Sequence, residues 1–369
     1  MKFRTVPMTA SLLALACAAH ADDGVVLSGV MDLAVRASNR QGPAADQNRS
    51  TLVSGGLSPS RLQIDMSHDV DADLKAIGQV DFRFQADTGV QDVGPFWQES
   101  WVGLKSRQFG QLTLGRQFNV LSDVATTFAA FRTIGPFLNS YKPEVGLAMG
   151  VRSDNAVKYL FERNGFAAEL QASAGEGQAF TTTQGKSFGG LVKYSGGPLG
   201  AGAGWLKRED EAGREATGVL VGASWTAGAM YLNAYVTRNS FADGFNAGLL
   251  LLGTGFENAL APSEPGQSLT GVNRRDMWSF GGTYAVSAAW QIGAQYWDVK
   301  QSFHAPLAPD ARGQFVAVIA DYKFSKRVDV YAALEHTSLT DYQLTDNATG
   351  KPNGATDRSS VMTGLRLRF

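Results

Sequence analysis

The sequence contains little cysteine, little charge and no second long apolar run. One cysteine among 369 residues cannot form an internal disulfide framework, and 33 basic against 34 acidic residues provide no positive excess for binding nucleic acid. Beyond residue 21, no stretch reaches the ~18 uncharged apolar residues that a membrane-spanning helix requires. These absences exclude a disulfide scaffold and a bundle of membrane helices, and they predict that nucleic acid is not a partner.

Apolar residues and glycine are nevertheless abundant. Hydrophobic residues make up 44% of the chain and there are 42 glycines, while charged residues reach only 18%, against about 25% in soluble domains. The mean hydropathy is −0.12. Strands with one face toward lipid and the other toward water would give a mean hydropathy near zero, as observed.

The N-terminus has the features of a secretory signal. Two basic residues precede the apolar run 9–19, and the segment AHA (19–21) fits the small-residue rule for signal peptidase. We expect residues 1–21 to be a signal peptide cleaved after Ala21, which leaves 22–369 as one mature domain and removes the only cysteine. Acylation at Cys17 is the alternative, but the residues before it fit a lipoprotein signal poorly.

Apolar and polar residues alternate in segments from Gly24 to the last residue. In LKAIGQVDFRFQ (74–85) the even-numbered residues are mostly apolar and the odd-numbered ones mostly polar. Period two places the two kinds of residue on opposite faces of a strand. The expected strands number sixteen and cover 24–38, 60–70, 74–85, 96–106, 110–117, 155–163, 166–175, 187–195, 199–208, 215–226, 229–239, 276–286, 290–300, 313–324, 327–339 and 358–369.

The connections between these strands alternate strictly in length. Tight turns such as RNG (163–165) and SKR (325–327) follow the even-numbered strands, whereas long stretches such as 39–59, 118–154, 240–275 and 340–357 follow odd-numbered ones. Lipid offers no hydrogen-bond partners, so a sheet that crosses a membrane must close without an edge. The pattern predicts an all-β fold: a 16-stranded antiparallel transmembrane β-barrel in the outer membrane of a Gram-negative bacterium, with short periplasmic turns and long extracellular loops.

Aromatic residues are expected at the membrane boundaries of this barrel. Tryptophans within the strands are candidates for an outward-facing girdle, namely Trp101, Trp205, Trp225, Trp278, Trp290 and Trp297. The terminal Phe369 ends an alternating strand and resembles the assembly signal of outer-membrane proteins.

Several segments resemble the general porins of β-proteobacteria, of the Neisseria, Burkholderia and Bordetella type. The matching segments are SRLQIDMSHDVDADLKAIGQVDFRF (60–84), ESWVGLKSRQFGQLTLGRQF (99–118), TIGPF (133–137), NAVKYLFERNGFAAELQAS (155–173) and FSKRVDVYA (324–332). The turn within 64–74 departs from the family because it lacks glycine. The resemblance implies a homotrimer surrounded by outer-membrane lipids and lipopolysaccharide. It also implies a third loop (118–154) folded into the lumen, and passive diffusion of ions and small hydrophilic solutes.

Selectivity in such a pore is set by its size and by the charges in its wall. Because charge on a lipid face is costly, parity predicts that wall charges point inward, among them Asp32, Arg36, Arg61, Lys75, Asp81 and Arg83. Arg116 shares parity with outward-facing leucines, but the resemblance places it at the mouth of the third loop. The third loop contributes Asp123, Arg132 and Glu144 to the expected constriction. We expect the wall arginines Arg36, Arg61, Arg83 and Arg116 to face Asp123 or Glu144, with a lean toward anions.

Two other motifs in the sequence do not indicate a ligand site. The aspartates at 69, 71 and 73 begin like a calcium loop but lack its glycine and glutamate. We expect the glycine row Gly200, Gly202 and Gly204 to make room for a neighbouring segment. We predict no catalytic residue, cofactor or metal. An outer-membrane phospholipase-like hydrolase, or a structural or adhesin barrel without an open channel, remains the alternative.

Overall fold

The structure is a computed structural model that describes residues 24–369, apart from 93, 129–148, 176–185, 211, 246–270, 305–309, 342, 345 and 347. The expected signal segment 1–21 lies outside the described residues. So do Arg132 and Glu144 of the third loop.

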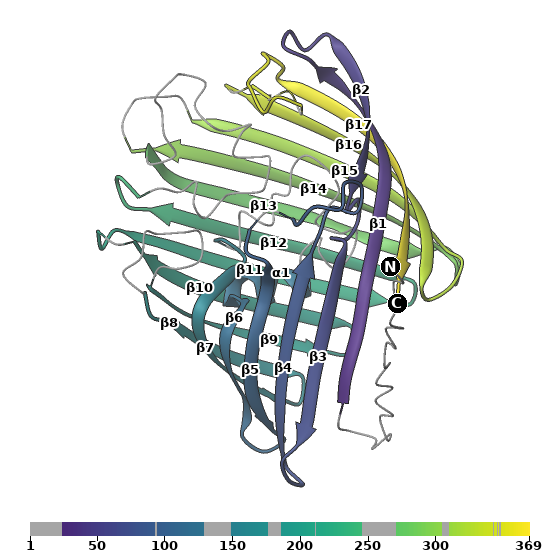
Figure 1. Cartoon of the computed structure of the whole chain (residues 1–369). Helices are drawn as coiled ribbons and strands as arrows, with labels where there is room; N and C mark the ends of the chain where they lie inside the picture. The colour runs from purple at the N-terminus through teal and green to yellow at the C-terminus, as the bar shows by residue number, and fades with distance from the viewer. Residues whose placement is uncertain are drawn as a thin grey trace, which may run out of the picture.

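Seventeen strands and one helix occur among the described residues, and the strands form a single antiparallel sheet (Figure 1). The elements are β1 Gly24–Gln41, β2 Gln47–Ser54, β3 Arg61–Asp69, β4 Leu74–Arg83, β5 Trp97–Ser106, β6 Gly110–Phe118, α1 Val120–Phe128, β7 Arg152–Arg163, β8 Phe166–Ser173, β9 Lys186–Gly196, β10 Leu199–Glu209, β11 Glu215–Ala227, β12 Met230–Phe241, β13 Val272–Ala285, β14 Trp290–Phe303, β15 Ala311–Lys323, β16 Val328–Thr340 and β17 Asp357–Arg368. Within the described part of the chain, no helix has the length and hydropathy needed to cross a bilayer.

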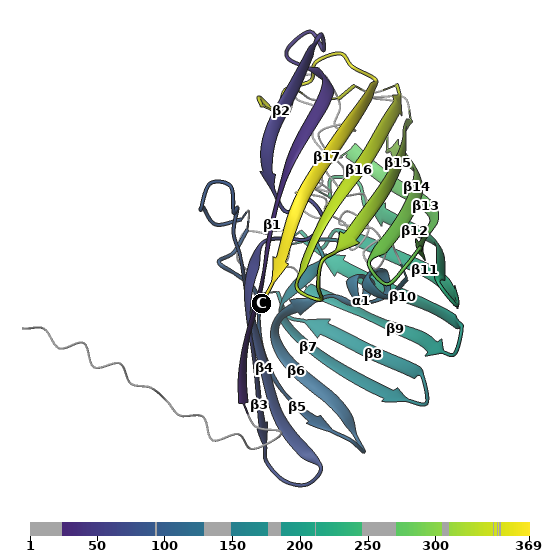
Figure 2. The same cartoon turned by 90° about the vertical axis from the view of Figure 1, so that its right-hand side faces the viewer.

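The sheet closes into a 16-stranded barrel because β2 and β3 share one position in the wall. β3 pairs with the first half of β1 (Gly24–Val30), and β2 pairs with its second half (from Leu33 to Gln41). On its other edge, β1 pairs with β17 from Val30 to Ser38. The expected fold class is therefore confirmed, and Figure 2 shows α1 within the curve of the barrel wall.

Each of the sixteen expected strands is present, with boundaries shifted by a few residues. The expected loop 39–59 was wrong in one respect, because β1 continues to Gln41 and the chain returns at once as β2. The break between β2 and β3 is held from inside: Asp32 accepts hydrogen bonds from the backbone N–H groups of Gly56, Leu57 and Ser58 at 3.2, 3.0 and 2.9 Å.

The barrel has an apolar outward face and a more polar inward face. In β10, Leu199, Ala201 and Ala203 are on the outward face, whereas Gly200 and Arg208 are buried on the inward face. Such alternation is what a strand between lipid and lumen requires.

The C-terminal strand completes the seam. Gly29 and Phe369 exchange two backbone hydrogen bonds of 2.9 and 3.1 Å, which extend the pairing of β1 with β17 to the last residue. Glycine at position 29 leaves room for the Phe369 ring, since a Cβ there would lie 2.7 Å from its Cε2 atom. The proposed assembly role of Phe369 remains a prediction.

At the long-loop rim, Asp346 joins the loop between β16 and β17 to the turn between β1 and β2. Its carboxylate accepts a hydrogen bond from the Gly42 N–H at 2.9 Å and lies 3.2 Å from the Arg49 guanidinium. The hydrogen bond from Gly42, followed by the hydroxyl of Thr349 and the charge of Arg49, holds the pKa of Asp346 below its ordinary value.

This contact should weaken in acid. A carboxylate with a lowered folded-state pKa stabilises the contact above its unfolded-state pKa, and that stabilisation is lost as the pH falls through the folded-state value. We expect the Gly42 amide to lose protection from hydrogen exchange, corrected for intrinsic rates, on acidification below the ordinary value of 3.8. Asp346→Ala should remove the protection at neutral pH, whereas Asp357→Ala, at an exposed ion pair with Arg40, should not. Equal protection in wild type and Asp346→Ala would contradict this role.

Candidate functional site

The chain turns into the barrel directly after β6 and forms α1. The side chain of Asn119 accepts a hydrogen bond from the Ser122 N–H at 3.0 Å, and Gln171 on β8 accepts one from the Val120 N–H at 3.1 Å. These acceptors satisfy N–H groups that a helix start leaves without intrahelical partners. The first N–H groups of α1 are therefore satisfied both by the preceding residue of the chain and by a side chain of the barrel wall.

The apolar face of α1 packs against glycines on the inward face of β10 and β11. We call Gly200, Gly202, Gly204, Gly218 and Gly222 the glycine cradle. A Cβ atom at Gly202 would lie 2.6 Å from Cε2 of Phe128, and one at Gly218 would lie 2.6 Å from Cδ1 of Leu121. Only glycine allows this close approach, which confirms the prediction that the glycine row of β10 makes room for a neighbouring segment.

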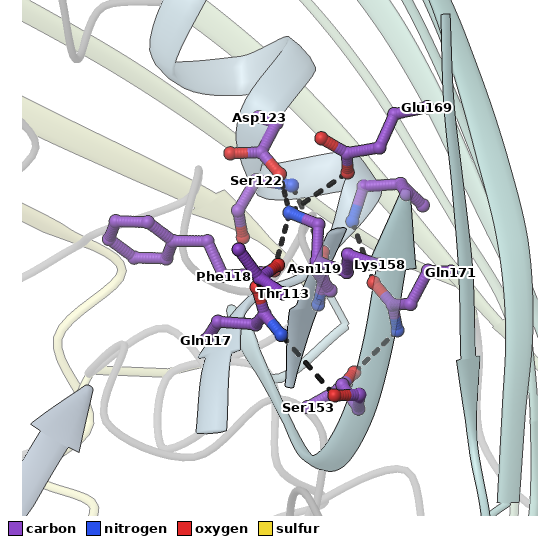
Figure 3. A network of polar contacts seen from close by, with 12 residues as sticks. Thr113, Gln117, Phe118, Asn119, Ser122, Asp123, Ser153, Lys158, Glu169 and Gln171 are labelled. Carbon is purple, nitrogen blue, oxygen red and sulfur yellow. Dashed lines mark hydrogen bonds and ion pairs between the residues drawn. The ribbon is translucent and has the colours of Figure 1, made fainter. Parts of the chain in front are cut away.

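Lys158 on β7 attaches the first turn of α1 to the wall (Figure 3). Its ammonium nitrogen lies 2.5 Å from Oδ2 of Asp123 and 2.9 Å from Oε1 of Glu169, and it donates to the carbonyl oxygen of Phe118 at 3.0 Å. The Lys158 and Glu169 side chains are only 8% and 6% exposed. A buried ammonium held by three oxygens at once fixes the place where the third loop enters the lumen.

An arginine cluster, which we define as Arg61, Arg83, Arg116 and Arg152, lies on the wall from β3 to β7. Arg61 and Arg83 are directly opposite each other in register and share Asp81, at 3.6 and 3.1 Å. Arg152 lies 3.9 Å from Glu99. The cluster thus brings together residues of β3, β4, β6 and β7, in one part of the barrel wall.

Arg116 pairs with Asp154, and it is placed by an irregularity in its strand. The pairing of β6 with β7 shifts register between Gly115 and Gln117, and Gly115 has a φ of 128° that glycine adopts freely. Arg116 shares parity with outward-facing leucines. The bulge explains why its side chain nevertheless meets Asp154, in the part of the wall that carries the arginine cluster.

The accessible charge of the arginine cluster is positive. Four guanidiniums face three carboxylates, those of Asp81, Glu99 and Asp154. The side chain of Arg61 is 31% exposed and that of Arg83 is 14% exposed, whereas their shared Asp81 is 3% exposed. A solute in the lumen therefore reaches the guanidiniums more readily than the carboxylate.

The remaining predicted wall residues lie elsewhere on the inward face. Lys75 pairs with Asp69 at 3.1 Å beside a short turn, and Arg36 lies opposite Thr51 and Met362, further toward the long-loop rim. Asp32 is fully buried and accepts a hydrogen bond from the Tyr331 hydroxyl at 2.6 Å. Asp32 is therefore a structural residue and does not line the open pore, which corrects the expectation for it. We expected Asp123 to face one of the wall arginines at 36, 61, 83 and 116. In the structure its partner is Lys158, which corrects that expectation.

The tryptophans divide between the two faces. Trp205, Trp225, Trp278 and Trp290 have exposed outward rings. Trp101 and Trp297 are on the inward face, where Trp101 donates to Glu99 at 3.4 Å and Trp297 donates to the Tyr235 hydroxyl at 2.8 Å. The expectation that all six form an outward girdle is corrected for these two, because a polar partner in the lumen satisfies each indole N–H.

Two inward residues were missed by the sequence analysis. Glu169 holds Lys158, and the fully buried Arg208 donates to the backbone oxygen of Arg152 at 2.7 Å. The alternation of each strand would have placed both side chains inward. In β8 the even-numbered Phe166 and Leu170 face outward, so the odd-numbered Glu169 faces inward, and in β10 Arg208 has the same parity as the inward glycine row. No group of three or more potential metal ligands occurs among the residues described.

Comparisons with known proteins agree with this architecture. The family model described as Gram-negative porin matches residues 9–342. The chain is similar to outer membrane porin protein 32 of Delftia acidovorans, with 31% identity over 250 residues, which cover 63% of this chain and 70% of that protein. It is also similar in structure to an anion-selective porin from Comamonas acidovorans (TM-score 0.70, 21% identity, covering 94% and 100% of the two chains) and to the trimer form of OmpT from Vibrio cholerae (TM-score 0.65, 19% identity, 94% and 99%).

Proposed function

The chain belongs to the Gram-negative porin family and forms a channel in the outer membrane; from this premise we propose that it passes small hydrophilic solutes by passive diffusion and prefers anions. The observation that carries the preference is the arginine cluster, in which Arg61 and Arg83 share the more deeply buried Asp81. A similar fold occurs in a porin described as anion-selective. In this proposal the cluster faces the part of the lumen beside α1.

Reversal potentials in a salt gradient test the preference. Arg61→Glu replaces one accessible positive charge by a negative one, and two charge units about 5 Å from an ion in water change its energy by about 1.7 kcal/mol. Chloride and potassium respond in opposite directions, so we expect the ratio of chloride to potassium permeability to fall by at least about tenfold at low salt, where the charge is least screened.

The matched control is Lys75→Glu, which makes the same charge change beside a short turn and away from α1. It should shift the ratio much less than Arg61→Glu. Cation preference in the wild type, or equal shifts in the two variants, would reject the proposed role of the cluster.

We also propose that the mature protein begins after residue 21, assembles as a homotrimer among outer-membrane lipids and lipopolysaccharide, and is not an enzyme. Support comes from the secretory features of the N-terminus, from the trimer form of a structural neighbour, and from homologues that are porins. Conductance steps in groups of three in planar bilayers are expected. Ester hydrolysis without conductance would favour the hydrolase alternative.

A further inference from the structure

A hollow of about 940 Å³ lies on the outward face of the barrel, over strands β7–β13. Its floor contains Ala201, Ala223 and Ala234, which are directly opposite one another on β10, β11 and β12. This volume is in the upper part of the range of about 300–1,000 Å³ that small-molecule sites occupy. We call it the outer hollow.

Large side chains bound the outer hollow on both sides along the same rows of the sheet. Phe166 pairs with Tyr194, which pairs with Ala201, and on the far side Ala234 pairs with Phe280. The side chains of Phe166 and Phe280 are 64% and 53% exposed. A row of three alanines between aromatic walls forms a trough that no side chain of the described residues fills.

The floor of the outer hollow lies directly behind the glycine cradle. Ala201 and Ala223 point outward, while their neighbours Gly202 and Gly222 point inward and contact Phe128 of α1. The barrel wall here consists of little more than backbone. A molecule bound in the outer hollow would therefore contact the outer side of β10 and β11, the strands against which α1 packs.

A positive charge stands at one end of the outer hollow. Arg163 is on its lining at the end of β7, beside the tight turn at Asn164 and Gly165, and it lies opposite Phe166 in register. Its side chain is exposed, and among the described residues it forms no ion pair or hydrogen bond. An exposed guanidinium at the short-turn rim is a donor for phosphate at the level of lipid headgroups.

We propose that the outer hollow binds one glycerophospholipid of the periplasmic leaflet, with an acyl chain on the alanine floor and the phosphate on Arg163. Lipid chains are as apolar as the wall, so shape and the headgroup contact must provide the preference over bulk lipid. A second copy of this chain would have to present a protruding apolar ridge to fill the outer hollow. The unpaired arginine at the rim favours the anionic headgroup.

Native mass spectrometry of the purified protein, titrated with dioleoyl phosphatidylglycerol in mild detergent, tests the proposal. We expect one tightly held phospholipid per wild-type chain and its loss in Ala223→Phe, whose ring occupies the floor. Arg163→Gln should bind the phospholipid about tenfold more weakly, the factor expected for one hydrogen bond to a charged group. A diacylglycerol without phosphate should bind wild type and Arg163→Gln equally.

The control is Ala332→Phe, which enlarges an exposed alanine on β16, outside the outer hollow. It should retain the lipid as wild type does, and unchanged conductance shows that each variant folds. Equal lipid retention in wild type, Ala223→Phe and Arg163→Gln overturns the proposal. A change in subunit number in Ala223→Phe overturns it as well, because the outer hollow would then be a contact between subunits.

Discussion

Lys158→Met should detach the start of α1 from the barrel wall and raise the single-channel conductance, with more current noise. Asp123 and Glu169 both rely on the Lys158 ammonium, and both are largely buried. Removing one partner of a buried ion pair costs about 3–5 kcal/mol, because a charge stays behind without compensation. Here two carboxylates are left facing each other, so α1 is expected to move away from the wall.

The control for this variant is Lys75→Met, which removes an inward lysine whose partner Asp69 is 39% exposed. It should leave conductance close to the wild-type value. The triple variant Lys158→Met, Asp123→Asn, Glu169→Gln removes all three charges and should recover much of the wild-type conductance. If Lys158→Met matches Lys75→Met in both conductance and denaturant midpoint, Lys158 does not anchor α1.

Gly202→Val should have the opposite effect and push α1 further into the lumen, which lowers the conductance. The new side chain would collide with the Phe128 ring, since even a Cβ atom would lie 2.6 Å from it. Overpacking of this kind typically costs about 1–3 kcal/mol. The strand itself should persist, because valine is favourable in β-structure.

Two further variants separate the collision from a general effect on β10. Ala201→Val enlarges the adjacent outward residue of the same strand and should leave the conductance unchanged. Phe128→Ala combined with Gly202→Val removes the colliding ring and should restore the conductance. Failure of this rescue, with a normal Ala201→Val channel, would mean that the glycine cradle does not position α1.

The strands themselves could be predicted because their pattern is local. Lipid on one face and water on the other impose period two on each strand separately, so segments such as 199–208 were located without knowing their neighbours. β2 was missed because the break that separates it from β3 is held by the carboxylate of Asp32 from another strand. A local pattern holds no information about such a partner.

The alternation of a strand predicts to which face a charged side chain points, but it does not predict with which other charge that side chain pairs. Parity indicated that Arg61 and Arg83 face the lumen, but it could not indicate that they share Asp81. Nor could it indicate that Lys158 holds Asp123 and Glu169. These contacts depend on the register with which neighbouring strands pair. The bulge beside Arg116 likewise overrides the parity of its own strand.

The barrel, the number of positions in its wall, the asymmetry of its rims and the inward direction of its charges could all be predicted from the amino-acid sequence. These follow from alternation and turn length, which are set within each hairpin. The position of α1, the pairing of the charges and the hollow in the outer wall became visible only in the folded barrel. Those features join residues on strands far apart in the chain, and their positions are set by the register of the closed sheet.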